Sequence, residues 1–413
     1  MTKKIPQSTV LKSLDLFCGC GGMTQGMSWA RGLHDESIQC VAAIDNWQPA
    51  CDTFTQNHPI EAACQGVSHD AVLRILERVG NIDLVTGGPP CQGFSTSGKR
   101  TLDDPRNGLV RCFLDAIEIS QPRAFVMENV TGFTTFQNGM LMAEVVARAR
   151  FMGFRVFPGI VLASLSGVPQ RRRRFILVGL RSGNFSFPGS RPQTSDDYGL
   201  FGQEQSEPVL ISQQVSDGIE RWSFDSATSD LAILAAGETR NEYRHEPENE
   251  FQYWARNGQQ FPTDHIAVSH NPRFVEMMSF IPSGASAMDK SVQANMPIGL
   301  RPKSGFPNSY ARIRGAQPAP TITRNFTTPS SANCIHPTAN RALSIREGAR
   351  CQSFLDSFVF SGTLTDRRLQ IGNAVPPLLA KAIGTQLLNA IFPSIDSKNK
   401  QPRLIDSTVP TPR

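Results

Sequence analysis

The sequence predicts an α/β protein in which a doubly wound, mostly parallel sheet is joined by a second, smaller domain. Three observations support this class. Short apolar runs alternate with stretches of helical periodicity through the first 181 of the 413 residues. Glycine- and proline-rich turns follow the apolar runs, as they do where buried parallel strands end in loops. Beyond residue 182 the periodicity fades, and Gly, Pro, Ser and Gln become more frequent.

The expected elements alternate along the first part of the chain. Strands are predicted at residues 14–17, 40–44, 61–65, from 82 onward and at 124–127. Helices are predicted at residues 23–31, 47–56, 71–79, 107–119 and 139–152. Residues 156–162 and 175–180 are expected to form an antiparallel pair. Near the C-terminus, helices are predicted at residues 341–354 and from a turn at 372–377 to about residue 390.

A glycine turn follows the first predicted strand. It reads CGCGG at residues 18–22 and leads into a stretch compatible with a helix. A strand, a glycine turn and a helix form a nucleotide-type cradle, because glycines let the backbone approach a ligand and the helix N-terminus offers free N–H groups. The spacing differs from the dinucleotide pattern, and a tight structural turn is the alternative. Asp45 ends the second strand, where a carboxylate is well placed to accept hydrogen bonds from ribose hydroxyls.

Two reactive side chains follow later strands. Two glycines and two prolines at residues 87–90 end an apolar run and present Cys91. Open α/β sheets bind ligands at the carboxyl edge of their strands, so this thiol is expected to face a cleft. The alternative is a buried cysteine that acts as a small hydrophobe. Glu128 follows the strand at 124–127 on the same edge, where a carboxylate is costly unless it is paired or used; a helix cap or a structural salt bridge is its alternative role.

Basic residues form two notable segments. Residues 92–106 are basic and poor in apolar side chains, which is typical of a mobile lid. Four consecutive arginines at residues 171–174 precede the second strand of the antiparallel pair. Such a run is often a solvated surface or a phosphate patch. On a strand, however, alternate side chains face opposite ways, so Arg172 and Arg174 can point into one site while the other two arginines point away.

Charge and cysteine content narrow the class further. The net charge is +5; residues 196–264 hold 14 acidic and 4 basic side chains, whereas residues 265–350 hold 10 basic and 3 acidic ones. If a polyanion binds the second domain, the later half is expected to contact it.

The nine cysteines are expected to be reduced thiols of a cytoplasmic protein, since the chain starts without a signal peptide. The sequence contains no C-x-x-C pair, so a structural zinc site is not expected. It also contains no apolar run long enough to span a membrane.

Six motifs make the sequence resemble the DNA cytosine-C5 methyltransferases over residues 13–391. They read DLFCGCGG at 15–22, GGPPCQGFS at 87–95, ENV at 128–130, QRRRR at 170–174, RALSIREGARCQSF at 341–354 and GNAVPP at 372–377. Each motif is modest alone, but six in the family's order with this spacing are highly specific. The resemblance implies S-adenosylmethionine as the methyl donor, double-stranded DNA as the partner and no metal.

The resemblance also implies roles for individual residues. The S-adenosylmethionine pocket would be lined by Phe17, Gly19, Gly21 and Gly22, with Asp45 on the ribose and Asn373 on the far wall. The catalytic set would comprise Cys91 as nucleophile, Glu128 as the group that holds the cytosine ring, and Arg174 and Arg172 as its companions. DNA contacts would come from Gln92, Ser95, Arg312 and Arg314. Where the family usually has Gly-Asp-Ile, this chain has GVS at 66–68, which leaves Asp70 as the candidate contact to the adenine amino group.

The expected organisation and reaction follow from this resemblance. A catalytic and cofactor-binding domain is expected at residues 1–181, a target-recognition domain at 182–340, a return to the catalytic domain at 341–392 and a polar tail at 393–413. The expected reaction transfers a methyl group to C5 of a flipped cytosine within a specific DNA sequence. A restriction endonuclease is expected as the functional partner in a bacterial cytoplasm, and the enzyme is expected to be a monomer.

Three alternatives compete with this interpretation. A tRNA cytosine-C5 methyltransferase would keep the chemistry, but the long variable region within 182–340 favours a module that reads duplex DNA. An inactive DNA-binding regulator of the same fold is disfavoured by the intact set of Cys91, Glu128 and Arg174. A thiol oxidoreductase would need a resolving cysteine, and none lies beside Cys91 in the sequence.

Overall fold

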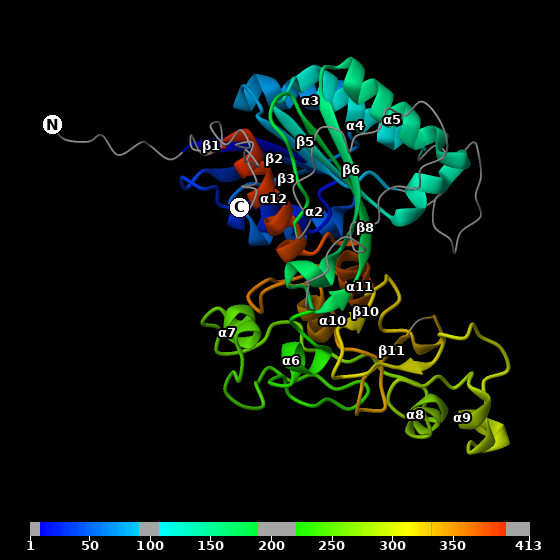
Figure 1. The fold of residues 1–413 in the computed structure, drawn as a ribbon. Coiled ribbons are helices and arrows are strands. Elements are labelled where there is room, and N and C mark those ends of the chain that lie inside the picture. The colour runs from blue at the N-terminus through cyan, green and yellow to red at the C-terminus, as the bar shows by residue number, and fades with distance from the viewer. Residues whose placement is uncertain (1–8, 91–106, 189–219, 332, 394–413) are drawn as a thin grey trace, which may run out of the picture.

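The computed structural model describes residues 9–90, 107–188, 220–331 and 333–393. The central strands are β1 (Val10–Leu16), β2 (Ser37–Asp45), β3 (Ala62–Cys64), β4 (Leu84–Gly87), β5 (Ala124–Asn129), β6 (Arg155–Leu162) and β8 (Arg173–Leu180). They form one seven-stranded sheet in the order β3-β2-β1-β4-β5-β8-β6 (Figure 1). The first five strands are parallel, and β8 runs antiparallel to both β5 and β6. The predicted doubly wound, mostly parallel sheet is confirmed, and so is the antiparallel pair.

Helices cover both faces of this sheet. One layer consists of α3 (His69–Val79), α4 (Asn107–Ser120) and α5 (Met140–Phe151), seen above the sheet in Figure 1. The opposite layer contains α1 (Gly22–Trp29) and α12 (Pro377–Ile391), with α2 (Gln48–Asn57) beside β2 and β3. The last helix therefore brings the C-terminal part of the chain back to its first helix. None of the helices in the described ranges has the length and apolar character needed to cross a bilayer.

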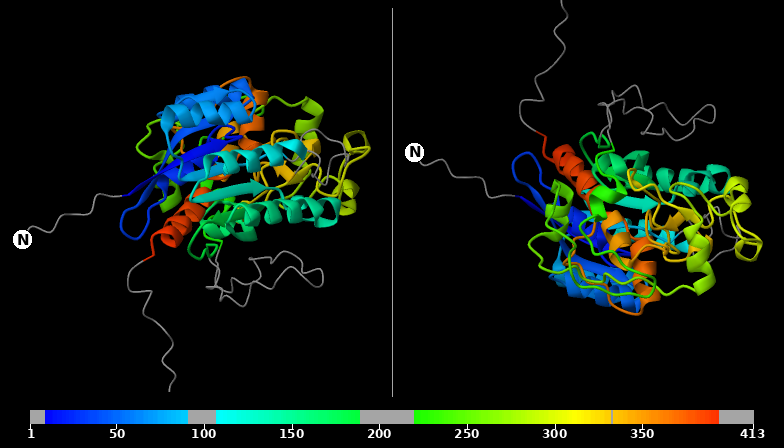
Figure 2. Two further views of the ribbon diagram at one scale, coloured as in Figure 1. Left: turned by 90° about the horizontal axis from the view of Figure 1, so that it is seen from above. Right: turned by 90° about the horizontal axis from the view of Figure 1, so that it is seen from below.

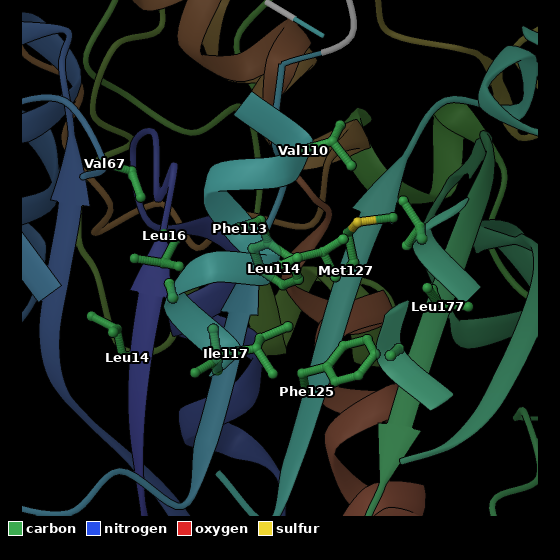
Figure 3. Close-up of a cluster of buried hydrophobic side chains, with 14 of the residues drawn as sticks. Leu14, Leu16, Val67, Val110, Phe113, Leu114, Ile117, Phe125, Met127 and Leu177 are labelled. Atoms are coloured by element: carbon green, nitrogen blue, oxygen red, sulfur yellow. The ribbon is translucent and has the colours of Figure 1, made fainter. Parts of the chain in front are cut away.

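The burial of β5 shows why the strands read as continuous apolar runs. All six of its residues are buried, because helices pack on both faces of the sheet. Phe125 and Met127 face the layer that contains α4, and Ala124 and Val126 face α1 and α12. Figure 3 shows Phe113 of α4 close to this inner face of the sheet, among the other buried side chains of the cluster.

A second group of short elements lies below the carboxyl edge of the sheet. It comprises α6 (Phe224–Thr228), α7 (Glu250–Arg256), α8 (Pro272–Ser279), α9 (Lys290–Ala294), β9 (Ala311–Arg312), β10 (Ala319–Pro320) and β11 (Asn333–Ile335). Two helices follow it, α10 (Ile345–Cys351) and α11 (Leu364–Asn373). Short β7 (Gln170–Arg171) leaves the large sheet and pairs with β10. In the described ranges the 3₁₀ helices are η1 (Thr131–Gly139), η2 (Ala163–Ser166), η5 (Ile298–Leu300) and η6 (Pro329–Ser331). Seen from below in Figure 2, these green, yellow and orange elements lie in front of the sheet.

Two helices near the C-terminus differ from the sequence prediction. The helix expected at 341–354 is shorter, because Ser344 caps α10 through reciprocal hydrogen bonds with Glu347 at 3.1 and 2.8 Å. Residues 364–373 form the helix α11 that the sequence did not reveal, since most of its side chains are polar. A second capping box, between Thr363 and Asp366, starts α11. The expected turn at 372–377 begins inside its last turn.

Buried ion pairs surround α10 and join it to Asp230 of the small domain. Arg350 lies between Asp230 and Asp356, and all three side chains are inaccessible to solvent. Arg341 donates two hydrogen bonds to Glu347 at 2.8 and 2.7 Å, also out of contact with solvent. A buried charge is tolerated only when it is paired, so each of these arginines fixes its acidic partner. Much of the basic charge expected to face DNA is therefore internal.

The packing of α1 against α12 generates a first prediction. A Cβ atom on Gly26 would collide with the Pro377 carbonyl oxygen and lie 2.6 Å from Cβ of Ala380. We expect Gly26→Ala to lower the free energy of unfolding by about 1–3 kcal/mol, as measured by urea denaturation, because the two helices must separate. The control is Gly108→Ala in α4, where nothing lies within 4 Å; alanine there should be neutral or stabilising. Equal unfolding midpoints for the two variants would contradict this packing.

Candidate active site

The candidate site lies where the strand order reverses. β1 and β4 are neighbours in the sheet although two strands separate them in sequence. Ligands of open α/β sheets bind at such a switch point, outside the carboxyl ends of the strands. The predicted residues Gly19, Asp45 and Glu128 follow or end β1, β2 and β5, so the structure gathers them at one edge. The turn before Cys91 leaves β4 at the same edge.

Glu128 and Arg174 form an ion pair at this edge. Glu128 is the fifth residue of β5, and Arg174 is the second residue of β8. Because the two strands are antiparallel, the end of one lies beside the start of the other. The distance from Arg174 Nε to Glu128 Oε1 is 2.8 Å, and the side chains are only 13% and 11% exposed. The two predicted residues are thus brought together in a largely dry setting, where a charged pair is strong.

The backbone around Glu128 is shaped by residues that the sequence analysis did not single out. A Cβ atom on Gly88 would lie 3.3 Å from Glu128 Oε2, so glycine lets the turn pass close to the carboxylate. Asn129 Nδ2 donates a hydrogen bond to the Pro89 carbonyl oxygen at 3.2 Å. Asn129 therefore holds the turn after β4 against the end of β5. The ENV motif contained this residue, but its contact across the sheet edge has no local sequence signal.

Three predicted residues cannot be placed. Cys91, Gln92 and Ser95 lie outside the described residues, and the described chain reaches the site at Pro90. A cavity of about 560 Å³ reaches Arg174 but is not lined by Glu128. It is lined by Thr131, Leu162, Arg171, Arg173, Arg174, Glu220 and Thr321. This cavity, called the active-site pocket below, therefore combines side chains of the large sheet with residues of the small domain.

The four arginines alternate between the interior and the surface. Arg171 faces outward and binds Glu220, with 2.6 Å between Nη2 and Oε2, and Arg173 is exposed. Arg172, expected in the catalytic set, is 1% exposed and donates to the carbonyl oxygens of Ile322 at 2.9 Å and Gly372 at 3.1 Å. Its guanidinium clamps two chain segments and has no face toward the pocket. Its Nε atom is buried without a hydrogen-bond partner in the described part of the chain, and the catalytic role of Arg172 stays a prediction.

The two arginines expected to contact DNA occupy different environments. Arg312 is 5% exposed. It donates to the carbonyl oxygens of Met278, Ile281, His336 and Ala339 and to the side chain of Asn340. A DNA contact by Arg312 is therefore wrong for this structure, because all its donors hold the small domain together. Arg314 is exposed and keeps its candidacy.

The glycine turn after β1 forms a cradle with unusual backbone angles. Phe17, Gly19 and Gly21 all have positive φ, at 55°, 53° and 90°. A Cβ atom on Gly19 would meet nothing within 4 Å, so this part of the turn faces open space. A Cβ atom on Gly22 would collide with the Val375 carbonyl oxygen. The turn is consequently left-handed in part, and it is held by the hydrogen bonds of the Gly19 N–H to Asp45 and of the Gly21 N–H to the Cys18 carbonyl oxygen.

Asp45 anchors this cradle. One of its carboxylate oxygens accepts the Gly19 N–H and the other accepts the Trp47 N–H, both at 2.9 Å. Burial raises the pKa of Asp45, and these two backbone hydrogen bonds oppose the shift. A carboxylate has about four lone-pair sites, so acceptor capacity remains for ligand hydroxyls. Asn373 is exposed at the end of α11, whose next residues touch the cradle through Val375.

His58 is a cradle residue that the sequence analysis missed. Its ring packs against Phe54 with 4.4 Å between ring centroids, and a Cβ atom on Gly21 would collide with it. Burial lowers the pKa of His58 to about 4, so the ring is neutral near pH 7. Its Nε2 atom is buried without a hydrogen-bond partner in the described part of the chain. A histidine that follows a polar helix gives no sequence signal of this placement.

Asp15 is a second missed residue, located beneath the cradle. It is 1% exposed and accepts hydrogen bonds from Thr24 Oγ1 at 2.5 Å and Thr86 Oγ1 at 2.9 Å. These contacts join β1, α1 and β4. Burial raises the pKa of Asp15 to about 6, although the two hydroxyls partly oppose that shift.

The turn between the third strand and α3 holds the candidate contact to the adenine amino group. Ser68 caps α3 by accepting the Ala71 N–H at 3.2 Å, and Asp70 is exposed in the first turn of that helix.

The fold and the site define a class of protein before any comparison. A mostly parallel seven-stranded sheet, a glycine cradle after β1 and an acidic residue at the end of β2 are the features of an α/β enzyme that binds a nucleoside cofactor. The sequence model of the C-5 cytosine-specific DNA methylase family matches residues 11–389, and the chain belongs to this family. It is accordingly a DNA (cytosine-5-)-methyltransferase.

Individual relatives agree with this family. The Type II methyltransferase M1.HphI of Haemophilus parahaemolyticus is 32% identical and covers 92% of this chain and 87% of its own length. The Type II methyltransferase M.AgeI of Thalassovita gelatinovora is 31% identical, with 92% and 100% covered. An Escherichia coli prophage protein described as a DNA modification methyltransferase has a similar structure, with a TM-score of 0.68, 22% identity and coverage of 92% and 99%. That last likeness shows the shared fold.

The buried carboxyl of Asp15 predicts a pH dependence of stability. Its pKa of about 6 in the folded protein lies above its ordinary value of 3.8, so its contribution to the free energy of unfolding is complete below pH 3.8 and is lost as pH rises through 6. Between pH 5 and pH 7 this loss amounts to about 1 kcal/mol. Asp15→Asn cannot titrate, so urea unfolding at the two pH values should show a smaller decline for the variant than for the wild type. A decline of equal size in both would refute the assignment to Asp15.

Proposed function

We propose that the enzyme methylates C5 of a cytosine that is flipped out of double-stranded DNA, using Cys91 as a covalent nucleophile. The observation that carries the proposal is the Glu128–Arg174 ion pair, at 2.8 Å, on the sheet edge where the turn preceding Cys91 also arrives. A base inside a stacked duplex cannot reach a pocket built from two strand ends, so the target must leave the helix.

The cradle fits S-adenosylmethionine as the methyl donor of this family. Gly19 would face the cofactor at the end of β1, since a Cβ atom there would meet nothing within 4 Å, whereas Gly21 and Gly22 let the turn pass close to His58 and Val375. Asp45 retains lone pairs for the ribose hydroxyls, and exposed Asn373 would close the far side. When bound, the cofactor supplies a methyl group activated by its positively charged sulfur.

Cys91 would activate the cytosine ring. C5 of cytosine is a weak nucleophile, and addition of a thiolate to C6 makes the ring electron-rich. A cysteine suits this step because its thiolate is accessible near neutral pH and is intrinsically nucleophilic. Negative charge then develops toward N3 and O2 of the ring. After methyl transfer, loss of the C5 proton and departure of the Cys91 sulfur restore the aromatic ring.

Glu128 and Arg174 would stabilise that developing charge. Glu128 Oε1 is occupied by Arg174, whereas Oε2 faces Gly88 and the turn before Cys91. Oε2 is therefore the oxygen that would carry a proton and donate it in a hydrogen bond to N3. Arg174 Nε binds Glu128 and Nη1 binds the Arg173 carbonyl oxygen, which leaves Nη2 for O2 of the base. Donors held in place before the reaction provide the stabilisation without reorganising.

The small domain would select the DNA sequence. Residues 182–340 remain our proposed target-recognition domain, and residues 1–181 and 341–392 the catalytic part. Exposed Arg314 and Arg324 would face the duplex, with Gln92 and Ser95 contacting DNA beside the flipped base. The similarity to bacterial Type II methyltransferases supports a role in protecting host DNA from a partner restriction endonuclease, in a bacterial cytoplasm. A monomer suffices for an enzyme that modifies one flipped base at a time.

Transfer of labelled methyl from S-adenosylmethionine tests the nucleophile. Purified protein should label duplex DNA that lacks 5-methylcytosine, and Cys91→Ser should abolish the transfer while leaving S-adenosylmethionine binding intact. The matched control is Cys64→Ser, at an exposed cysteine of β3, which should transfer normally. Duplex DNA containing 5-fluorocytosine should trap a covalent adduct, because fluorine at C5 blocks the final elimination.

The same assay separates the competing functions. Labelling of tRNA without labelling of DNA would select the tRNA methyltransferase, and DNA binding without any transfer would select the inactive regulator. An adduct mapped by mass spectrometry to a residue other than Cys91 would overturn the assigned nucleophile.

Arg174 provides an independent prediction. Arg174→Lys keeps a positive charge but cannot bind Glu128 and the base at once, so methyl transfer should fall by about 10²–10³. The control is Arg181→Lys, just beyond the other end of β8, where the guanidinium binds the Pro122 carbonyl oxygen at 2.9 Å. Single-turnover rates with saturating S-adenosylmethionine measure both variants. Equal rates for Arg174→Lys and the wild type would remove Arg174 from the reacting centre.

A further inference from the structure

A second cavity, of about 350 Å³, lies in the small domain away from the Glu128–Arg174 pair. We call it the α11 pocket. Its walls come from residues 268–271, residues 327–330, the aromatic rings of Phe274 and Tyr310, and the first two turns of α11. The volume falls near the lower end of the range of about 300–1,000 Å³ that is usual for ligand pockets.

The lining of the α11 pocket favours an anion. Hydroxyl groups of Ser and Thr residues dominate its polar surface, Arg368 adds a cation, and no Asp or Glu lines it within the described residues. The remaining ionisable residue, His270, is neutral near pH 7, because burial lowers its pKa. A cavity lined by several hydrogen-bond donors and one positive charge, with no carboxylate in its lining, attracts a phosphate group.

Arg368 is the side chain that points to a missing ligand. Its Nη1 atom donates to Thr328 Oγ1 at 3.1 Å, whereas Nε is buried and has no partner in the described part of the chain. The ion pairs of the described residues do not include Arg368, although its neighbour Arg367 binds Asp264 at 2.6 Å. Nε is out of reach of solvent, so a bound anion would contact the terminal N–H groups of the guanidinium that Thr328 does not take up.

The end of α11 adds to this attraction. Leu364 and Thr365 form the first turn of the helix and line the pocket. The first N–H groups of any helix lack intrahelical acceptors and carry partial positive charge. Asp366 also lies in this turn and keeps its negative charge; its Oδ2 atom accepts the N–H and hydroxyl of Thr363 at 2.9 and 2.6 Å, and it does not line the pocket. The helix end and Arg368 therefore act on the same ligand.

The α11 pocket is connected to the active-site pocket by a short stretch of chain. Thr321 lines the active-site pocket and Thr327 lines the α11 pocket. Six residues span at most about 22 Å, even when fully extended. At a rise of about 3.4 Å for each nucleotide, the two pockets lie within roughly six base pairs of one another on a duplex. This separation is short enough for one bound duplex to span both pockets.

We propose that the α11 pocket binds one phosphate of the DNA backbone near the flipped cytosine, with Arg368 as its principal contact and the rings of Phe274 and Tyr310 against the adjoining deoxyribose. The inference rests on the proposed function for its choice of DNA as the anion. The contact positions the duplex and reads no bases, since phosphates carry no sequence information. It also supplies surface charge to a domain in which Arg312, Arg341 and other arginines are buried.

The salt dependence of DNA binding tests this proposal without knowledge of the recognition sequence. Fluorescence anisotropy measures Kd for a labelled, mixed-sequence duplex between about 50 and 200 mM salt. Arg368→Gln should weaken binding about tenfold at the lower salt concentration and reduce the slope of log Kd against log salt by about 0.9, the value for one phosphate. Arg368→Lys should restore the slope. The control Arg78→Gln, at an exposed residue of α3, should match the wild type.

Other outcomes would overturn the α11 pocket as a DNA site. Weaker binding by Arg368→Gln with an unchanged slope would show that Arg368 only supports Thr328. Stabilisation of the wild type by inorganic phosphate, lost in Arg368→Gln without any change of slope, would assign the pocket to a free anion. Methyl transfer is measured in parallel on the wild type: absence of transfer with a slope change in Arg368→Gln would reject the proposed reaction and retain the phosphate contact.

Discussion

The ion pair between Glu128 and Arg174 is the constraint on which the site depends. It exists because β8 runs against the other strands, so its first residues meet the last residues of β5. In a wholly parallel sheet, a residue at the start of a strand would lie at the opposite edge. Breaking a buried pair leaves an uncompensated charge and typically costs about 3–5 kcal/mol, a penalty that this pair, at 13% and 11% exposure, feels only in part. The reversed strand thus turns a sheet edge into a place where a carboxyl group and a guanidinium share one wall.

The arginines of this chain serve two purposes that composition cannot separate. Residues 265–350 contain 10 basic side chains, and four of these are buried: Arg312, Arg341, Arg346 and Arg350. They bind carbonyl oxygens or carboxylates, so their charge is used inside the protein. The electrostatic attraction for DNA must therefore come from fewer, exposed cations, and Arg368, which lies outside that basic segment, gains importance.

The cofactor cradle depends on chain segments from both ends of the sequence. Gly22 packs against the Val375 carbonyl oxygen and Gly26 against that of Pro377, so α12 can approach α1 only where side chains are absent. Arg172 reaches the Gly372 carbonyl oxygen from a third segment, and Gln170 donates to the Cys351 carbonyl oxygen at 3.0 Å. These main-chain contacts join the glycine turn, the arginine run and the C-terminal motif into one unit. Asp15 stabilises the cradle by accepting hydrogen bonds from Thr24 of α1 and Thr86 of β4.

The sequence by itself determined the strands and helices of the large sheet, because apolar runs buried on both faces and helical periodicity are local patterns. It also determined that Asp45 and Glu128 end strands at one edge, since carboxyl ends of parallel strands coincide. Only the tertiary structure decided the fate of the arginines: the same run sends Arg172 inside and Arg174 to Glu128, and Arg312 is buried although its sequence context is basic. Burial and pairing depend on segments more than a hundred residues apart, such as Arg172 and Ile322. A local sequence pattern cannot show which distant segment such a side chain will contact.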